Sequence, residues 1–317
     1  MKVALLFPGQ GSQYVGMGKD FFDTYPEVRD DFEKASEVLG FDLARLCFEG
    51  PEDKLKQTQN TQPALLTVEY AMYRQFSRHF DSFSAAAGHS LGEYSALLAA
   101  GVFSFRDAVA LVRKRGEFMA ETRNGSLVAC MGLSNEVVWD LCRKLSENGV
   151  ISPALFNAPG QVVVAGEVPV LEEFIKKTES IEGARATMLK VSGPFHCSLL
   201  DSASGKLSAQ MSHLLMNRPS LTVFANVSGE PSDDVNEIRE NLTRQVNSPV
   251  FWTKCVENLC SRGYNTFVEI GPGNVLKGLV RKINREAKVF NVSKVEDIRK
   301  VSQELEDKNN ETEMERQ

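Results

Sequence analysis

A serine between two glycines is the first candidate for chemistry in this sequence. Gly88-His89-Ser90-Leu91-Gly92 matches the pattern GxSxG, in which a strand turns sharply into a helix and exposes the serine hydroxyl. Because this hydroxyl is a weak nucleophile, it needs a nearby base. The free N–H groups that begin the following helix favour negative charge. Serine is also a frequent helix N-cap, so the motif alone leaves Ser90 as a nucleophile or a cap.

Four histidines are available as the base, and His196 is the strongest candidate. It ends the motif SGPFH at 192–196, a rigid loop predicted to leave a strand, and loops at strand ends often carry catalytic groups. Cys197 beside it is predicted to be a small buried side chain rather than half of a Cys–His pair. The other histidines, two predicted on polar helix surfaces and one predicted to pack or to hydrogen-bond beside the serine, are His79, His213 and His89.

An arginine falls on the apolar face of a predicted helix at 106–122. Its apolar residues follow the i, i+3, i+4 spacing of one buried stripe, and Arg115 lies on that stripe. A buried guanidinium is costly unless it is paired, so Arg115 needs an anionic partner. Two alternatives are open: a protein carboxylate such as Glu93 or Glu117, or the planar carboxylate of a ligand.

The elements around these residues predict an α/β fold with a parallel, hydrolase-like sheet. A strand at Val3–Phe7 leads into a glycine-rich turn, and a strand at Phe83–Gly88 leads into the serine motif. Further strands are predicted at Thr222–Asn226 and Thr266–Ile270. The predicted helices around them lie at 63–80, 91–100, 202–215, 235–246 and 253–261.

Residues 125–191 show a different pattern, with strands and helices in the order βαββαβ. This order is that of a ferredoxin-like unit, predicted here as a subdomain inserted into the catalytic domain. The catalytic domain then comprises residues 1–124 and 192–300. The remainder, 301–317, is a charged tail, predicted to continue as a helix and then to fray into disorder.

Composition excludes several classes of protein. The 317 residues carry 36 basic and 42 acidic side chains, a net charge of −6, which argues against a nucleic-acid binder and a polybasic membrane surface. No segment approaches the roughly 18 apolar residues of a membrane span, and no signal or transit segment is recognised. The six cysteines are scattered in a pattern that fits neither a metal site nor a disulfide framework. We therefore expect a cytoplasmic protein without a bound metal.

The motifs, taken in order, resemble those of the malonyl-CoA:acyl-carrier-protein transacylase family. The resemblance covers most of the chain before the charged tail. It rests on FPGQGSQYVGMG at 7–18, NTQPALLTVEYA at 60–71, AGHSLGEYSAL at 87–97, VRKRGEFM at 112–119, FNAPGQVVVAG at 156–166, VSGPFHCSLL at 191–200, NSPVFWTKCVE at 247–257 and VEIGPGNVLKGL at 268–279.

The resemblance implies roles for the residues that match the family motifs. Ser90 would carry the acyl group, with His196 as its base and later the acid for the departing thiol. The backbone N–H groups of Gln10 and Leu91 would form the oxyanion hole. The backbone carbonyl of Gln245 would orient His196 in place of the usual aspartate.

The resemblance also implies the substrate. Arg115 would bind the malonyl carboxylate, and the bulky Phe195 is typical of members that prefer malonyl over methylmalonyl. Malonyl, methylmalonyl and succinyl groups remain open alternatives from the pocket residues alone.

The expected partners are malonyl-CoA and acyl-carrier protein, whose own phosphopantetheine accepts the acyl group, so no cofactor is expected. A chain without fused domains favours fatty-acid over polyketide synthesis, and we expect a monomer. Since the net charge of −6 does not attract an acidic carrier protein, docking would need a local basic patch. Candidates are Lys190, Lys277, Arg281 and Lys282.

Two rival functions are consistent with part of the pattern. A serine esterase or thioesterase also carries GxSxG, but it usually places an acidic residue and then a C-terminal histidine after the serine. A buried Arg115 has no use in a hydrolase of neutral esters. A non-catalytic docking module would not need Ser90, His196 and Arg115 together.

Overall fold

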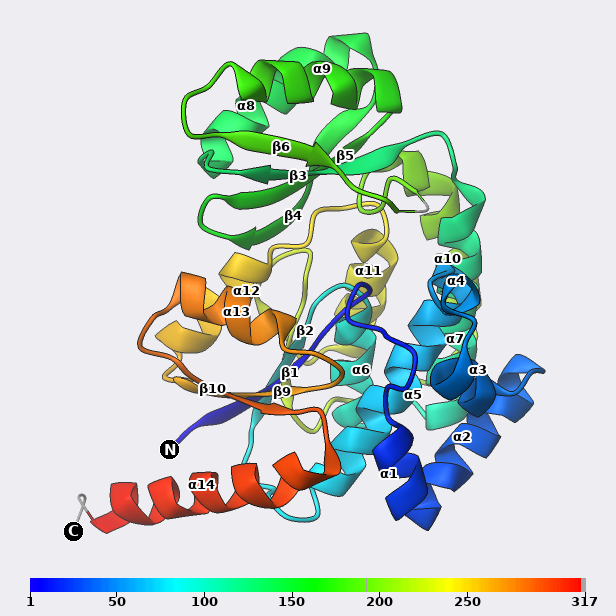
Figure 1. Ribbon diagram of the computed structural model, residues 1–317, viewed down its shortest axis with the longest axis vertical. Coiled ribbons are helices and arrows are strands. Elements are labelled where there is room, and N and C mark those ends of the chain that lie inside the picture. Colours follow the sequence, from blue (N-terminus) through cyan, green and yellow to red (C-terminus); the bar gives the residue numbers. More distant parts are fainter. Residues whose placement is uncertain (192, 315–317) are drawn as a thin grey trace.

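The computed structural model describes residues 1–191 and 193–314 of the chain, and it contains two separate sheets (Figure 1). The larger has the strand order β10-β9-β1-β2-β7-β8, and its strands are parallel except for the pair β7–β8. The predicted α/β class is confirmed. The strands are β1 Val3–Phe7, β2 Ala85–Gly88, β7 Thr222–Phe224, β8 Pro231–Ser232, β9 Thr266–Ile270 and β10 Lys288–Val292.

Helices cover both faces of this sheet, as a parallel sheet requires. The side chains of β1 alternate between two cores: Leu5 and Phe7 face one cluster, and Ala4 and Leu6 face the other. The first cluster is built mainly by α1 Lys19–Thr24, α2 Pro26–Leu39, α3 Leu43–Glu49, α4 Glu52–Leu55, α5 Thr58–Phe76, α6 Leu91–Ala99, α7 Phe105–Glu121, α10 Asp201–Ser212, α11 Val235–Gln245 and α14 Val295–Met314. The second is built by α12 Trp252–Ser261 and α13 Val275–Ile283.

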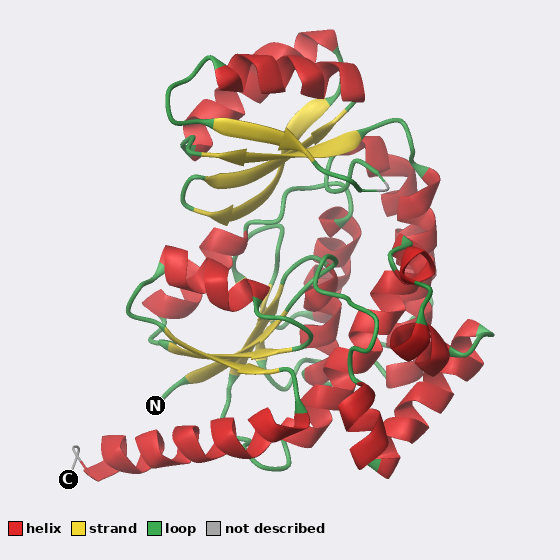
Figure 2. Cartoon of the chain, viewed as in Figure 1, coloured by secondary structure: helices red, strands yellow, loops and turns green. Residues whose placement is uncertain are grey.

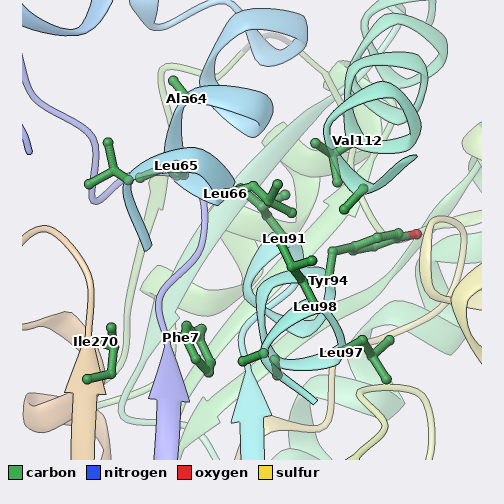
Figure 3. Close-up of a cluster of buried hydrophobic side chains, with 14 of the residues drawn as sticks. Phe7, Ala64, Leu65, Leu66, Leu91, Tyr94, Leu97, Leu98, Val112 and Ile270 are labelled. Carbon is green, nitrogen blue, oxygen red and sulfur yellow. The ribbon is translucent and has the colours of Figure 1, made fainter. Parts of the chain in front are cut away.

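The larger core fixes the three helices that carry the candidate residues. Figure 3 shows Leu66 of α5 and Leu91 of α6 close to Val112 of α7, and Tyr94 of α6 and Phe7 of β1 belong to the same cluster. All five side chains are buried. At about 1.5–3 kcal/mol for each large apolar side chain, this contact holds α6 and α7 in one orientation to the sheet.

The second sheet is antiparallel and has the order β4-β5-β3-β6, which is the ferredoxin-like order. Figure 2 shows it at one end of the molecule, with helices on its outer face. Phe156 of β4 stacks on Phe251, with ring centroids 5.2 Å apart, and so attaches this sheet to the rest of the protein. The elements are β3 Ser126–Met131, α8 Asn135–Leu145, β4 Ile151–Ala158, β5 Gln161–Gly166, α9 Val168–Glu179 and β6 Arg185–Met188.

The predicted start of α5 is wrong. The sequence places it at Pro63, a residue that often opens a helix, but the helix begins at Thr58. Proline inside a helix leaves the carbonyl four residues earlier without its donor. Here that carbonyl belongs to Gln59, and Arg113 of α7 donates to it at 2.9 Å. A side chain from a neighbouring helix thus makes the interior proline tolerable.

The charged tail at 301–317, predicted to continue as a helix and then to fray into disorder, is helical over its described part. Helix α14 continues to Met314, and residues 315–317 lie outside the described residues. Ile298, Val301 and Leu305 recur every three or four residues and are buried against the main core. In the sequence these three apolar positions are difficult to recognise as a buried stripe, because charged residues surround them.

Two strands were not predicted, the short β8 and the edge strand β10. The latter pairs with β9 in parallel. In the described residues, none of the helices is both long and apolar enough to cross a membrane.

Candidate active site

Ser90 lies on the sharp turn between β2 and α6, as the GxSxG motif predicts. Its backbone φ is +53° and its ψ is −102°. The flanking glycines are required sterically: a Cβ atom on Gly88 would overlap the backbone of Gly92, and one on Gly92 would overlap the Phe7 carbonyl. Close packing of the turn against the end of β1 therefore fixes where the Ser90 side chain lies.

Backbone strain is concentrated at two residues. Among the described residues, Ser90 and His196 are the only non-glycine residues with positive φ, at 53° and 64°. Such conformations cost of order 1–3 kcal/mol and persist only where the surroundings impose them. Both strained residues are the ones predicted to be catalytic.

The Ser90 hydroxyl and the His196 ring form a hydrogen-bonded chain. Ser90 Oγ lies 2.8 Å from His196 Nε2, and His196 Nδ1 lies 2.7 Å from the backbone carbonyl of Gln245. A carbonyl only accepts, so Nδ1 carries the proton and Nε2 of the neutral ring accepts from the serine. This arrangement suits a general base, and a carbonyl takes the place that a carboxylate has in many serine hydrolases.

Burial keeps His196 neutral. Its side chain is almost fully buried, and burial together with the positive charge of Arg115 lowers its pKa to about 3. At neutral pH the ring therefore carries no proton on Nε2 and is ready to accept one.

Arg115 is 1% exposed, as its place on the apolar stripe of α7 predicts. Its Nη2 donates to Ser90 Oγ at 3.2 Å and to Gln245 Oε1 at 2.8 Å. The guanidinium lies 5.1 Å from the centre of the Tyr94 ring, within cation–π distance.

No carboxylate of the described residues lies within 4 Å of the Arg115 guanidinium. Glu117, one of the two protein carboxylates left open by the sequence, pairs instead with Arg113 at 2.7 Å and Lys114 at 2.9 Å. Glu93, the other, does not contact Arg115 directly and is connected to it through the Gln245 side chain. The positive charge beside Ser90 is thus left without a directly bonded anion.

Asn226 supports the strained turn and was missed in the sequence. Its Nδ2 donates to the Gly88 carbonyl and its Oδ1 accepts from the Ser90 N–H, each at 2.7 Å. The side-chain amide thereby continues the β2–β7 pairing past the end of both strands. The signal was available, because the strand predicted at Thr222–Asn226 ends at the same sheet edge as the serine motif.

Glu93 and Gln245 complete a buried polar group below the serine. Glu93 Oε2 accepts from the Asn226 N–H at 3.1 Å and from Gln245 Nε2 at 2.7 Å. Gln245 Nε2 also donates to the Ser90 carbonyl at 2.8 Å. Burial raises the pKa of Glu93 to about 7. We call Glu93, Arg115, Asn226 and Gln245 the elbow cluster.

The two predicted oxyanion donors lie beside the turn. Leu91 is the first residue of α6, so its N–H has no partner inside that helix. Gln10 lies in the turn after β1, next to Gly9, which packs closely on the His89 carbonyl. The Gln10 side chain donates to Thr58 Oγ1 at 3.3 Å. Their role in binding an oxyanion stays a prediction.

The remaining predicted residues surround this centre. His89 hydrogen-bonds Asn157 of β4 through Nε2 at 2.7 Å and packs on Trp252, which confirms its supporting place. Phe195 is buried beside His196, while Ser192, the first residue of their motif, lies outside the described residues. The residues predicted on the surface or as a small buried thiol are confirmed as such: His79, His213 and Cys197.

The residues of the predicted basic patch lie on α13 and just after β6. Arg281 and Lys282 are exposed on α13, and Lys277 on the same helix is partly exposed. Lys190 follows β6 and is exposed. Lys282 Nζ donates to Gln161 Oε1 of β5 at 2.8 Å, so α13 contacts the antiparallel sheet directly.

Comparison with known proteins identifies the family. The acyl transferase domain model matches residues 4–316. A malonyl CoA-acyl carrier protein transacylase from Escherichia coli O157:H7 is 43% identical over 284 residues, which cover 88% of this chain and 92% of the relative. The crystal structure of a malonyl CoA-acyl carrier protein transacylase from Clostridium perfringens superimposes with a TM-score of 0.94 at 40% identity, covering 99% of this chain and 100% of that one.

A third similar structure is a complex. It holds a type II PKS acyl-carrier protein together with its malonyl-transacylase, which is 39% identical with a TM-score of 0.91, covering 94% of this chain and 98% of that one. The fold, the order of the motifs and these likenesses agree, and the chain belongs to the malonyl-CoA:acyl-carrier-protein transacylase family.

Proposed function

We propose that this protein transfers the malonyl group from malonyl-CoA to the phosphopantetheine thiol of acyl-carrier protein, through an ester on Ser90. The observation that carries the proposal is the position of Arg115. Its guanidinium donates to the same Ser90 hydroxyl that hydrogen-bonds His196, and no carboxylate of the described residues pairs with it. A nucleophile beside a buried cation that has no directly bonded carboxylate suits an acyl group that carries its own carboxylate.

In the first half-reaction, the malonyl carboxylate binds Arg115 and its thioester carbonyl faces Ser90. His196 Nε2 takes the hydroxyl proton as Oγ attacks, and the carbonyl oxygen becomes an oxyanion facing the Gln10 and Leu91 amides. One such donor typically contributes about 3–4 kcal/mol to the transition state. His196 then returns the proton to the sulfur, and coenzyme A leaves.

In the second half-reaction, the carrier-protein thiol attacks the malonyl ester while His196 accepts the thiol proton. The same oxyanion site is used again, and collapse returns Ser90 to its hydroxyl form. In this step the carrier-protein thiol must attack the ester faster than water does. The burial of Arg115 and His196 supports exclusion of water from the ester.

The buried Phe195 next to His196 favours malonyl over methylmalonyl by limiting space beside the ester. Candidate contacts for the carrier protein are Lys190, Lys277, Arg281 and Lys282. The net charge of −6 supports a protein that binds neither nucleic acid nor an anionic membrane. We further propose that it acts as a monomer in the cytoplasm and supplies fatty-acid synthesis.

The test is intact-mass measurement after incubation with malonyl-CoA or acetyl-CoA, without carrier protein. We expect a malonyl adduct on the parent protein, little acetyl adduct, and no adduct on Ser90→Ala. Arg115→Ala should lose the preference for malonyl by about 100-fold, as expected for loss of a charged hydrogen-bonded contact.

Lys114→Ala is the matched control, because Lys114 is the neighbouring cation on the same helix but is exposed and pairs with Glu117. It should keep the preference. Release of coenzyme A without any adduct would indicate hydrolysis instead of transfer. Absence of both adduct and release would contradict the proposed function.

A further inference from the structure

The Gln245 side chain joins two buried charges. Its Oε1 accepts from Arg115 at 2.8 Å, and its Nε2 donates to Glu93 at 2.7 Å. One amide therefore lies between a guanidinium and a carboxylate, with its dipole aligned to both. Arg115 is 1% and Glu93 is 2% exposed, so water screens little of the field between them. Glu93 is the counter-charge of Arg115 when no substrate is bound.

From this geometry we propose that binding of the malonyl carboxylate at Arg115 is coupled to uptake of a proton from solvent by Glu93. The inference rests on the proposed function and adds a specific role for Glu93. A substrate carboxylate beside Arg115 brings a second negative charge into the same buried region. Protonation of Glu93 keeps one negative charge opposite one positive charge, and the proton is the only additional species that the step requires.

The other groups around Glu93 do not take this proton in its place. Tyr94, on the same helix, has its pKa raised to about 12 by burial, and the Cys255 thiol of α12 also has a raised pKa. Both stay neutral near pH 7. Asn226 and Gln245 do not titrate, and Arg115 is the one cation that faces Glu93 among the described residues.

Glu93 can change its protonation state near neutral pH. Burial raises its pKa to about 7, so it is about half ionised near neutral pH before substrate binds. A new negative charge nearby raises this pKa further. The direction then follows from linkage: malonyl-CoA binds more weakly as pH rises, because Glu93 must first regain its proton.

Calorimetry on Ser90→Ala, which binds without reacting, measures the proton directly. Malonyl-CoA is titrated at about pH 7 in buffers of different ionisation enthalpy, and acetyl-CoA is the matched ligand that has the same coenzyme but no carboxylate. We expect malonyl-CoA to take up about half a proton more than acetyl-CoA. Equal uptake for the two ligands would overturn the proposal.

The assignment to Glu93 is tested with Ser90→Ala/Glu93→Gln. We expect the Kd for malonyl-CoA to rise about tenfold from pH 6.5 to 8.5 in Ser90→Ala, and to stay nearly constant when Glu93 is also glutamine. Glu117→Gln in the same background is the control, since Glu117 pairs with Arg113 and Lys114 on the surface of α7. It should retain the tenfold change.

Infrared difference spectroscopy covers the case in which the Glu93 variant does not fold. Malonyl-CoA minus acetyl-CoA difference spectra of Ser90→Ala should contain the band of a newly protonated carboxyl group. Proton uptake without that band would assign the proton to a histidine and contradict the role of Glu93. Malonylation of the parent protein with no pH-dependent binding would refute this inference alone, whereas failure of Ser90 to be malonylated would refute the proposed function itself.

Discussion

Two buried glutamates in the same protein core have very different surroundings. Glu93 belongs to the elbow cluster and accepts hydrogen bonds from Asn226 and Gln245. Glu69 of α5 is fully buried, and among the described residues its carboxylate oxygens have no hydrogen bond of standard geometry, although the nearby Ser95 hydroxyl lowers its pKa. Its electrostatic neighbour is Glu269 of β9, another carboxylate. Burial raises the pKa of both Glu93 and Glu69.

The difference shows that burial alone does not make a carboxyl group useful. Hydrogen bonds and a nearby cation hold the pKa of Glu93 near 7 and connect it to Ser90 through Gln245. No cation offsets the charge of Glu69: the Ser95 hydroxyl lowers its pKa, but burial and the charge of Glu269 hold that pKa well above the ordinary value. We expect substitutions in the first region to change catalysis, and substitution of Glu69 to change stability.

The largest effect is expected from His196→Ala. It removes the base for Ser90 while the elbow cluster keeps its hydrogen bonds, so folding should be little affected. We expect transfer to carrier protein to slow by at least about 10³-fold, as for loss of a catalytic-triad member. Rapid-quench measurement of malonyl transfer gives the rate.

His213→Ala is the control, because His213 is exposed on the surface. A decrease of less than about tenfold in His196→Ala would mean that another group deprotonates Ser90. The region around Ser90 could then no longer be called catalytic on the basis of the Ser90–His196 hydrogen bond.

A smaller effect is expected from Asn226→Ala. The substitution removes both side-chain hydrogen bonds that hold the strained turn, those to Gly88 and to Ser90. We expect kcat to fall by about 30-fold, with little change in KM for malonyl-CoA, because Arg115 is not altered. Loss of stability should be about 2 kcal/mol, from buried backbone groups left without partners.

The exposed Asn236 provides the matched control as Asn236→Ala. If Asn226→Ala lost stability but kept its kcat, the amide would only stabilise the fold. The elbow cluster would then resemble the Glu69 region, in which substitution is expected to change stability and not catalysis.

The reacting residues of the site could be predicted from the sequence better than the residues that hold them in place. Ser90 and Arg115 could be recognised locally, because a GxSxG turn and a charge on an apolar stripe are visible within a few residues. The contact between the His196 ring and the Gln245 carbonyl followed from the family resemblance. Asn226 was missed because its partners lie 136 and 138 residues away along the chain, and only its place at the end of a predicted strand indicated its role.

The fold was predicted where periodicity was strong. The βαββαβ order of the second sheet and the strand before Ser90 could be predicted from apolar patterns. The beginning of α5 could not, because the compensation for Pro63 comes from Arg113 of another helix. The helical part of the tail was expected, but its packing against the core was not, because charged residues outnumber the few apolar ones that anchor α14.

The smallest effect is expected from Glu69→Gln, and it is an effect on stability. The pKa of Glu69 is raised in the folded state above its ordinary value of 4.5, so the folded protein holds this proton more tightly than the unfolded chain. Stability from this group is therefore fully present below about pH 4.5 and is lost as pH rises toward the folded pKa. Glutamine has no proton to lose, so the variant should gain about 1–2 kcal/mol over the parent between pH 5 and 8.

Urea unfolding of both proteins at the two pH values measures this gain, with the exposed Glu172→Gln as control. Malonyl transfer should stay unchanged, since Glu69 belongs to no hydrogen bond of the elbow cluster. A stability difference that is the same at both pH values would show that Glu69 ionises alike in the folded and unfolded chains. In that case its surroundings, the Ser95 hydroxyl included, compensate its charge, and the lack of a facing cation does not distinguish Glu69 from Glu93.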